Sequence, residues 1–132
     1  MEYRIYYETS HAAAALVEKG EFEPALQMFH DLAHSDISDI DKALMCYNAA
    51  NVCGKMKRVE DAIAWYDAGI AYEQPYMRFL VLEYKAFYFS ELGRDAEALA
   101  IYEHLYRQPY VTESEKERLW KNITVMKNPR PT

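Results

Sequence analysis

A nine-residue phrase occurs three times in this chain, and its period limits the possible folds more than any other feature. The copies begin at Ala25, Ala62 and Ala98, so the intervals are 37 and 36 residues. An aromatic residue follows each alanine four positions later, one helical turn along the same face. Repeats of this period are typical of stacked arrays, in which no unit can bury its apolar face alone.

A second segment with apolar residues at intervals of three and four precedes each phrase, which predicts pairs of amphipathic helices. Short charged turns join the two members of a pair, and Pro75 and Pro109 separate one pair from the next. The pattern predicts an all-α fold of seven helices, at residues 3–19, 22–34, 38–54, 58–73, 75–92, 95–107 and 112–126.

The turns inside the pairs predict where the first helix of each pair ends. Gly20 and Gly93 lie at matching positions, where a left-handed residue commonly ends a helix. The middle pair has Lys57 at this position, and we expect it to adopt a positive φ at a cost of about 1 kcal/mol.

Two helix starts have capping signals. Ser38 with Asp41 resembles a capping box, and Thr112 with Glu115 fits one well. The helix that Thr112 starts is expected to cover the end of the array. Its apolar side is predicted from the spacing of the residues that follow, Leu119, Trp120, Ile123 and Met126. A helix that a partner displaces from a binding surface is the alternative.

Composition excludes several classes of protein. The net charge of −6 argues against sequence-independent binding of nucleic acid, which needs a basic face. No apolar run approaches the roughly 18 residues of a membrane span, and the first residues do not resemble a secretory leader. Cys46 and Cys53 are expected to be small buried residues in a reducing cytoplasm, since CxxC spacing and a nearby histidine cluster are absent.

The repeats resemble tetratricopeptide repeats, whose units of about 34 residues contain two helices. The resemblance rests on small residues at Ala25, Ala62 and Ala98, aromatic residues at Phe29, Tyr66 and Tyr102, and small residues in the first helices at Ala13, Ala50 and Ala86. Leu16, Cys53 and Phe89 replace the family's usual tyrosine, and Thr9, Cys46 and Leu82 replace its tryptophan. The resemblance implies a right-handed superhelix of three helix pairs with a C-terminal solvating helix. It would form one domain, residues 1–132, with repeats at about 5–37, 38–74 and 75–110.

In this family the first helices line a concave groove that receives a peptide or a partner's helix. Carried over by register, the resemblance places Tyr7, Ser10, His11, Ala14, Glu18, Leu44, Tyr47, Asn48, Asn51, Lys55, Leu80, Glu83, Tyr84, Phe87 and Glu91 along that groove. The neighbouring Tyr88 and Phe89 are expected in the core, because four near-consecutive aromatics cannot all face one way.

The predicted function is non-enzymatic binding of a protein or peptide, as a scaffold or adaptor. An acidic C-terminal carboxylate is not the expected ligand, because Ser10, Leu80 and Tyr84 stand where such grooves carry cations. The alternatives are a module that forms homo-oligomers, a small secretion chaperone of the same family, and a small enzyme or sensor with a ligand in the groove.

No glycine-rich phosphate loop, serine nucleophile elbow or metalloprotease motif occurs in the sequence. His30 and His34 lie four residues apart, but two ligands do not make a structural metal site. We therefore expect the chain to need neither a metal nor a cofactor.

Overall fold

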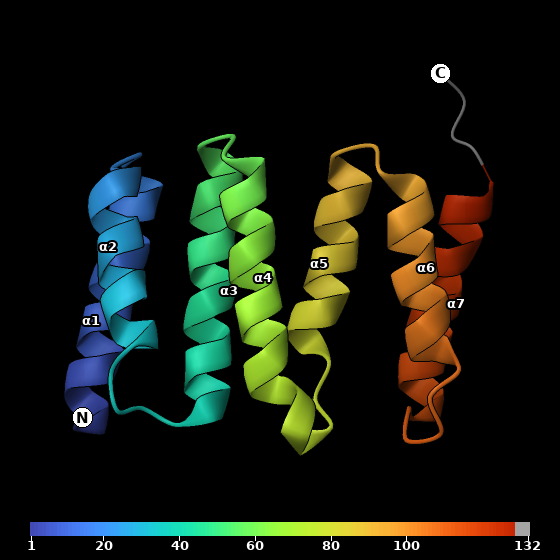
Figure 1. The fold of residues 1–132 in the computed structure, drawn as a ribbon, viewed down its shortest axis with the longest axis horizontal. Coiled ribbons are helices and arrows are strands. Elements are labelled where there is room, and N and C mark those ends of the chain that lie inside the picture. The colour runs from blue at the N-terminus through green and yellow to red at the C-terminus, as the bar shows by residue number, and fades with distance from the viewer. Residues whose placement is uncertain (129–132) are drawn as a thin grey trace. The chain divides into compact units, whose positions relative to one another are not determined.

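The computed structural model describes residues 1–128, and the last four residues of the predicted domain lie outside the described range. Within the described range the fold is all-α, without strands (Figure 1). Its elements are α1 (Tyr3–Glu18), α2 (Phe22–Ala33), α3 (Asp39–Lys55), α4 (Val59–Glu73), the short 3₁₀ helix η1 (Gln74–Tyr76), α5 (Leu80–Glu91), α6 (Asp95–Tyr106) and α7 (Glu113–Lys127). Six of the seven predicted helices begin and end within one residue of the expected positions.

The start of the fifth helix was predicted wrongly, at residue 75 instead of Leu80. Pro75 lies in the 3₁₀ turn η1, and Met77 then adopts a left-handed conformation with φ 56°, so the chain cannot continue directly as a helix. The carboxylate of Glu73, at the end of α4, accepts a hydrogen bond of 2.7 Å from the Val81 amide. This buried side chain satisfies one of the free amides in the first turn of α5 and thereby fixes where that helix begins.

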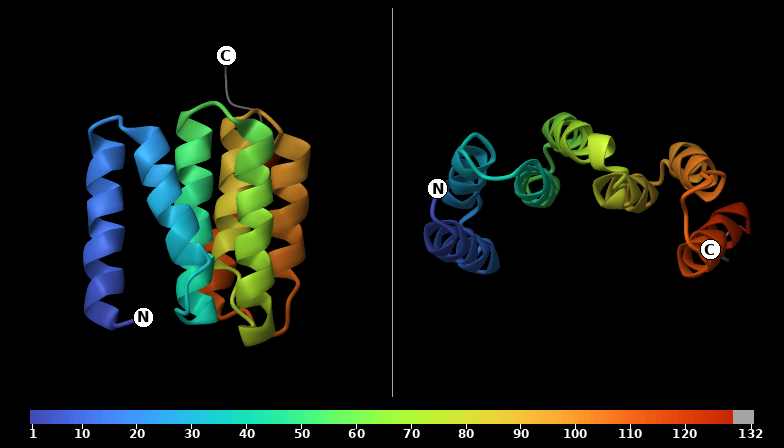
Figure 2. Two further views of the ribbon diagram at one scale, coloured as in Figure 1. Left: turned by 60° about the vertical axis from the view of Figure 1, so that its left-hand side comes forward. Right: turned by 90° about the horizontal axis from the view of Figure 1, so that it is seen from below.

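The chain divides into two compact units, Met1–Val81 (unit 1) and Leu82–Thr132 (unit 2), and the boundary falls near the start of α5. In unit 1, α1 packs on α2, α2 on α3 and α3 on α4. Figures 1 and 2 show α1–α2 and α3–α4 as hairpins of antiparallel helices. Consecutive helices therefore pack on one another in unit 1, as expected for a helical repeat.

The repeated alanines and aromatics form the core of the hairpins. Ala25 in α2 and Ala62 in α4 are completely buried, and Phe29 and Tyr66 are buried one turn later. Ala98 and Tyr102 in α6 have the same low exposure within unit 2. The three copies of the phrase thus share one pattern of burial, which is compatible with a helical repeat. The other fully buried small residues of the core include Ala13, Ala49, Ala50, Cys53 and Ala86.

Both cysteines are buried and free, as expected from their spacing. Burial raises the pKa of Cys46 to about 11 and also raises the pKa of Cys53, because an apolar environment disfavours the thiolate. Neither thiol is therefore an activated nucleophile.

In unit 2, α7 packs on α6 through an apolar stripe that includes Leu119 and Ile123. Thr112 and Glu115 form the predicted capping box at the start of α7. Trp120 was expected on the same apolar side, but 54 % of it is exposed. It lies one position beyond Leu119, about 100° around the helix, and its ring rests against that of Tyr106 with centroids 5.7 Å apart.

The three turns within the helix pairs share one geometry. Gly20, Lys57 and Gly93 have φ values of 78°, 62° and 76°, and the residue after each donates a backbone hydrogen bond to the carbonyl five positions earlier. This is the Schellman arrangement, which needs a left-handed residue at the end of the helix. Lys57 therefore adopts the strained conformation that its position in the repeat predicted.

Replacing Lys57 with glycine is expected to raise the free energy of unfolding by about 1 kcal/mol, because glycine adopts positive φ without strain. Urea unfolding followed by circular dichroism measures the change. The reciprocal substitution Gly20→Ala should lower stability by a similar amount, since a Cβ there meets no atom within 4 Å and only the backbone conformation opposes it. A Lys57→Gly protein less stable than the original would show that the lysine side chain contributes more than its backbone costs.

Candidate functional site

Three exposed ring side chains, those of Tyr3, Tyr7 and His11, lie next to one another on α1 within unit 1. Tyr7 and His11 are among the predicted binding residues. The ring of Tyr7, which is 49 % exposed, lies 6.2 Å from that of Tyr3 and 4.1 Å from that of His11, centroid to centroid. Ser10 is half-buried, and its hydroxyl donates to the Tyr7 carbonyl at 3.0 Å. Ala14 and Glu18 continue the exposed surface toward the end of the helix. This face of α1 is thus apolar at its start and polar at its end.

The predicted binding residues of α3 also change from apolar to polar along the helix. Leu44 is 42 % exposed in the first half of the helix, and Asn51 and Lys55 are exposed in the second. The amides of Asn48 and Asn51 have no hydrogen-bond partner within residues 1–128, so both can pair with a ligand backbone. Tyr47 is half-buried with its ring 6.2 Å from that of Tyr66, and so contributes to the hairpin core as well as to the surface.

The predicted binding residues of α5 differ in their exposure to solvent and in their contacts. Tyr84 and Phe87 are 36 % and 56 % exposed, and Leu80 lies one turn before them with 44 % of its surface exposed. The spacing i, i+4 and i+7 places the three on one stripe, which Glu91 ends. Tyr88 and Phe89 are buried, as their positions in the helix predicted.

Glu83 is not free for a ligand, because it is engaged inside unit 2. Its Oε1 accepts hydrogen bonds from Nη2 and Nε of Arg118 at 2.9 and 3.3 Å. The bond raises the pKa of Arg118, since the carboxylate favours the charged guanidinium. This pair joins α5 to α7, and no local sequence signal predicts it because the partners are 35 residues apart.

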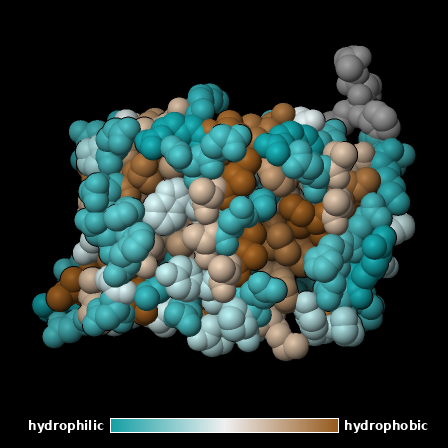
Figure 3. Space-filling view, viewed as in Figure 1, coloured by the Kyte–Doolittle hydropathy of each residue, from teal (hydrophilic) through white to brown (hydrophobic). Residues whose placement is uncertain are grey.

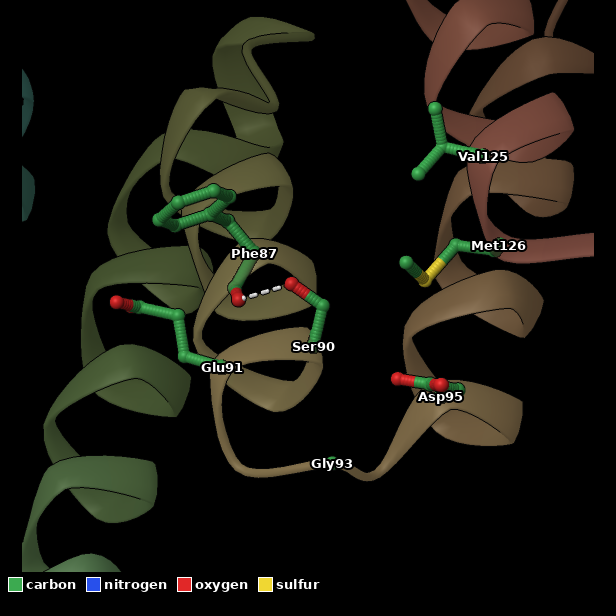
Figure 4. Close-up of a pocket in the computed structure, with 7 residues that line it drawn as sticks. All are labelled: Phe87, Ser90, Glu91, Gly93, Asp95, Val125 and Met126. Atoms are coloured by element: carbon green, nitrogen blue, oxygen red, sulfur yellow. Dashed lines mark hydrogen bonds between the residues drawn. The ribbon is translucent and has the colours of Figure 1, made fainter. Parts of the chain in front are cut away.

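A cleft of about 440 Å³ opens between α5, the start of α6 and the end of α7 within unit 2. Figure 4 shows Asp95 of α6 and Val125 and Met126 of α7 projecting toward α5, whereas the side chains of Phe87 and Glu91 project from α5 on the side away from them. The other lining residues are Ser90 and Gly93. The cleft thus adjoins the exposed stripe of α5 and adds an apolar wall from α7, which sequence register alone did not place there.

The second helices of unit 1 present a different surface. The face of α2 drawn in Figure 3 is largely hydrophilic, in agreement with its exposed polar residues. A shallow pocket of about 250 Å³ lies between α2 and α4, and the half-buried Trp65 contributes to its lining. The rings of His30 and His34 lie 4.4 Å apart and 5.9 and 6.3 Å from the Trp65 ring, respectively, between centroids. Arg58 at the pocket is already paired with Glu23 and Asp61, so its guanidinium is engaged within unit 1.

Within residues 1–128 no group of three histidine, cysteine, aspartate or glutamate side chains is placed to hold a metal ion. The same residues include no helix long and apolar enough to cross a membrane. No protein-family model matches the chain, and no curated protein or solved structure matches it significantly.

Proposed function

We propose that this chain is a tetratricopeptide-type repeat protein that binds another protein or a peptide through the exposed faces of the first helices of its hairpins. It acts as a scaffold or adaptor and not as an enzyme. The free, buried cysteines agree with a reducing compartment such as the cytoplasm.

The observation that carries the proposal is the contrast between first and second helices. The first helices α1, α3 and α5 expose Tyr7, Leu44 and Phe87, each at a position that the repeat register assigns to a binding surface. Exposed aromatic and aliphatic side chains on preformed helices are the usual anchors of an interface, because little conformational entropy is lost when they bind. Core packing does not account for these three exposed side chains. The aromatic residues of the second helices, Phe29, Tyr66 and Tyr102, are the ones buried in the core.

The polar residues of these faces favour a ligand other than an acidic C-terminus. Lys55 is the one basic residue among the predicted binding positions that lie on α3, and Ser10 and Tyr84 occupy positions where a carboxylate clamp would carry cations. A carboxylate bound there would lose hydration without compensation. The amides of Asn48 and Asn51 suit the backbone of an extended segment instead.

The proposal is tested by capturing partners from a native extract with the tagged protein and with a Leu44→Ala/Phe87→Ala variant. Both side chains are exposed, so the variant should fold, which circular dichroism and thermal unfolding verify. We expect at least tenfold lower recovery of the specific partner, because truncation of interface anchors costs about 2 kcal/mol or more. Calorimetric titration of the purified partner then gives the loss in affinity directly.

The matched control is Trp120→Ala, which removes an exposed aromatic outside the predicted binding positions. It should recover the partner as well as the original protein does. Equal recovery by Leu44→Ala/Phe87→Ala would overturn the assignment of the exposed faces of α3 and α5 to partner binding.

Self-association is a second candidate, favoured by the exposed Tyr3–Tyr7 pair on α1. Two such apolar faces can pair symmetrically. Light scattering over a hundredfold range of protein concentration separates the candidates. A mass that rises with concentration, and falls back to that of the monomer in Tyr3→Ser/Tyr7→Ser, would assign the α1 face to self-association.

A further inference from the structure

Two histidines lie side by side on the exposed face of α2. His30 and His34 are four residues apart, about one helical turn, and the centroids of their rings are separated by 4.4 Å. Both residues are exposed, so an ion from solvent can reach the rings. Two histidines at this spacing are the arrangement with which a single helix holds one zinc ion through both imidazoles.

The hydrogen bonds of the two rings leave the same nitrogen available on each. Nδ1 of His34 lies 2.8 Å from the main-chain carbonyl oxygen of His30, and Nδ1 of His30 lies 3.2 Å from Oδ1 of Asp31. Hydrogen bonds from His30 and Gln27 lower the pKa of Asp31, so its carboxylate is ionised and can only accept. Each Nδ1 therefore carries a proton, and Nε2 of the neutral ring presents a lone pair. Neither Nε2 has a hydrogen-bond partner within residues 1–128.

These partners are of the kind that accompanies metal-binding histidines. In such sites the nitrogen that does not bind the metal almost always donates to a carboxylate, carbonyl or water, which fixes the tautomer and makes the other nitrogen more basic. The half-buried ring of Trp65 lies beside both imidazoles, 5.9 Å from His30 and 6.3 Å from His34 between centroids, and restricts their movement on that side.

The spacing and charge of the pair also suit a shared cation. Two imidazoles on one tetrahedral ion have ring centroids about 5 Å apart, given metal–nitrogen bonds of about 2.0 Å, and the present separation of 4.4 Å is close to this. Asp31 has no lysine or arginine partner within residues 1–128, so its negative charge beside the histidines favours a cation there.

We propose that His30 and His34 bind one divalent transition-metal ion through their Nε2 atoms. Imidazole suits zinc, copper and nickel, whereas magnesium and calcium prefer oxygen ligands. Two protein ligands leave the other coordination positions to water, so the site is unlike a structural zinc site with four protein ligands. The inference goes beyond the proposed function, because the site lies on a second helix and its ion needs no protein partner.

The test is a titration of the untagged, ¹⁵N-labelled full chain with Ni²⁺ at neutral pH, followed by NMR. Paramagnetic Ni²⁺ broadens the signals of nearby nuclei steeply with distance. We expect the amide signals of residues 30–34 and the indole signal of Trp65 to broaden before any others. Calorimetry should give one Ni²⁺ or Zn²⁺ ion per chain, and Mg²⁺ at the same concentration should give no heat of binding.

Variants assign the ion to the pair. His30→Gln and His34→Gln should each lower the affinity for Ni²⁺ at least tenfold, because the second nitrogen no longer binds within the same molecule. The matched control His104→Gln removes an exposed imidazole from α6 and should leave the affinity unchanged. The NMR spectra of the ion-free proteins report whether each variant is folded.

Three results would overturn the inference. Equal affinity in the original protein and in either single variant would mean an adventitious ion only, bound by separate histidines. Broadening that begins around His11 or His104 would place the ion elsewhere. Binding of Mg²⁺ with the affinity of Zn²⁺ would assign the ion to carboxylates such as Asp31 and not to the imidazoles.

Discussion

Replacing Phe29 with alanine is expected to lower the free energy of unfolding by about 3–5 kcal/mol, the usual cost of removing a buried aromatic ring. Phe29 is 3 % exposed in the core that α2 forms with its neighbours, among Leu32, Met45 and Val52. A rigid hairpin core closes a cavity of this size only in part, so the lost contacts are not replaced. Chemical denaturation of the two proteins at 25 °C measures the difference.

The matched control is Phe87→Ala, which removes the same ring from an exposed position. Because 56 % of Phe87 is exposed, we expect a loss of about 0.5 kcal/mol, typical of a surface substitution. Comparing the two variants thus distinguishes a phenylalanine that stabilises the fold from one that is available for binding. A loss above 2 kcal/mol for Phe87→Ala would contradict its assignment to a binding face.

The sequence contained enough information to place most helices, because the same local signals recur in each pair. Apolar spacing of three and four marks the buried stripe, and the left-handed residues Gly20, Lys57 and Gly93 mark where the first helices end. The same spacing separated Tyr84 and Phe87 from their buried neighbours. These are properties of a single helix, so no knowledge of distant residues was needed.

The features that escaped prediction depend on residues far apart in the chain or on tertiary contacts. The start of α5 follows from the carboxylate of Glu73, eight residues before the amide it caps, and from the left-handed Met77. The engagement of Glu83 follows from Arg118 on another helix, and the half-burial of Tyr47 from its packing on Tyr66. The repeat register alone could not predict which residues of other helices these side chains contact.

Gly69 is the position at which the largest destabilisation by an added side chain is expected. A Cβ built there would lie 3.1 Å from the Ala43 carbonyl oxygen, 3.1 Å from Cγ1 of Val81 and 3.2 Å from Cβ of Cys46. The first of these is a backbone atom inside α3 and cannot move aside as a flexible side chain would. The hydrogen atom of glycine therefore allows α3 and α4 to pack this closely.

Gly69→Leu is expected to destabilise the protein by about 3 kcal/mol or more, because overpacking forces the helices apart along the hairpin. Gly69→Ala sets two effects against each other. Alanine favours a helix interior by about 1 kcal/mol over glycine, but its methyl group meets three atoms at distances below ordinary van der Waals contact. Since the nearest of them is fixed, we expect the steric cost to exceed the gain, with a net loss of about 1 kcal/mol.

The control Ala64→Leu adds a larger side chain to an exposed position of the same helix and should change stability by less than about 0.5 kcal/mol. Thermal unfolding of the three variants beside the original protein ranks them in a single experiment. A Gly69→Ala protein more stable than the original would mean that α4 shifts away from α3 at little cost. Tight packing of that hairpin would then not be what keeps glycine at this position.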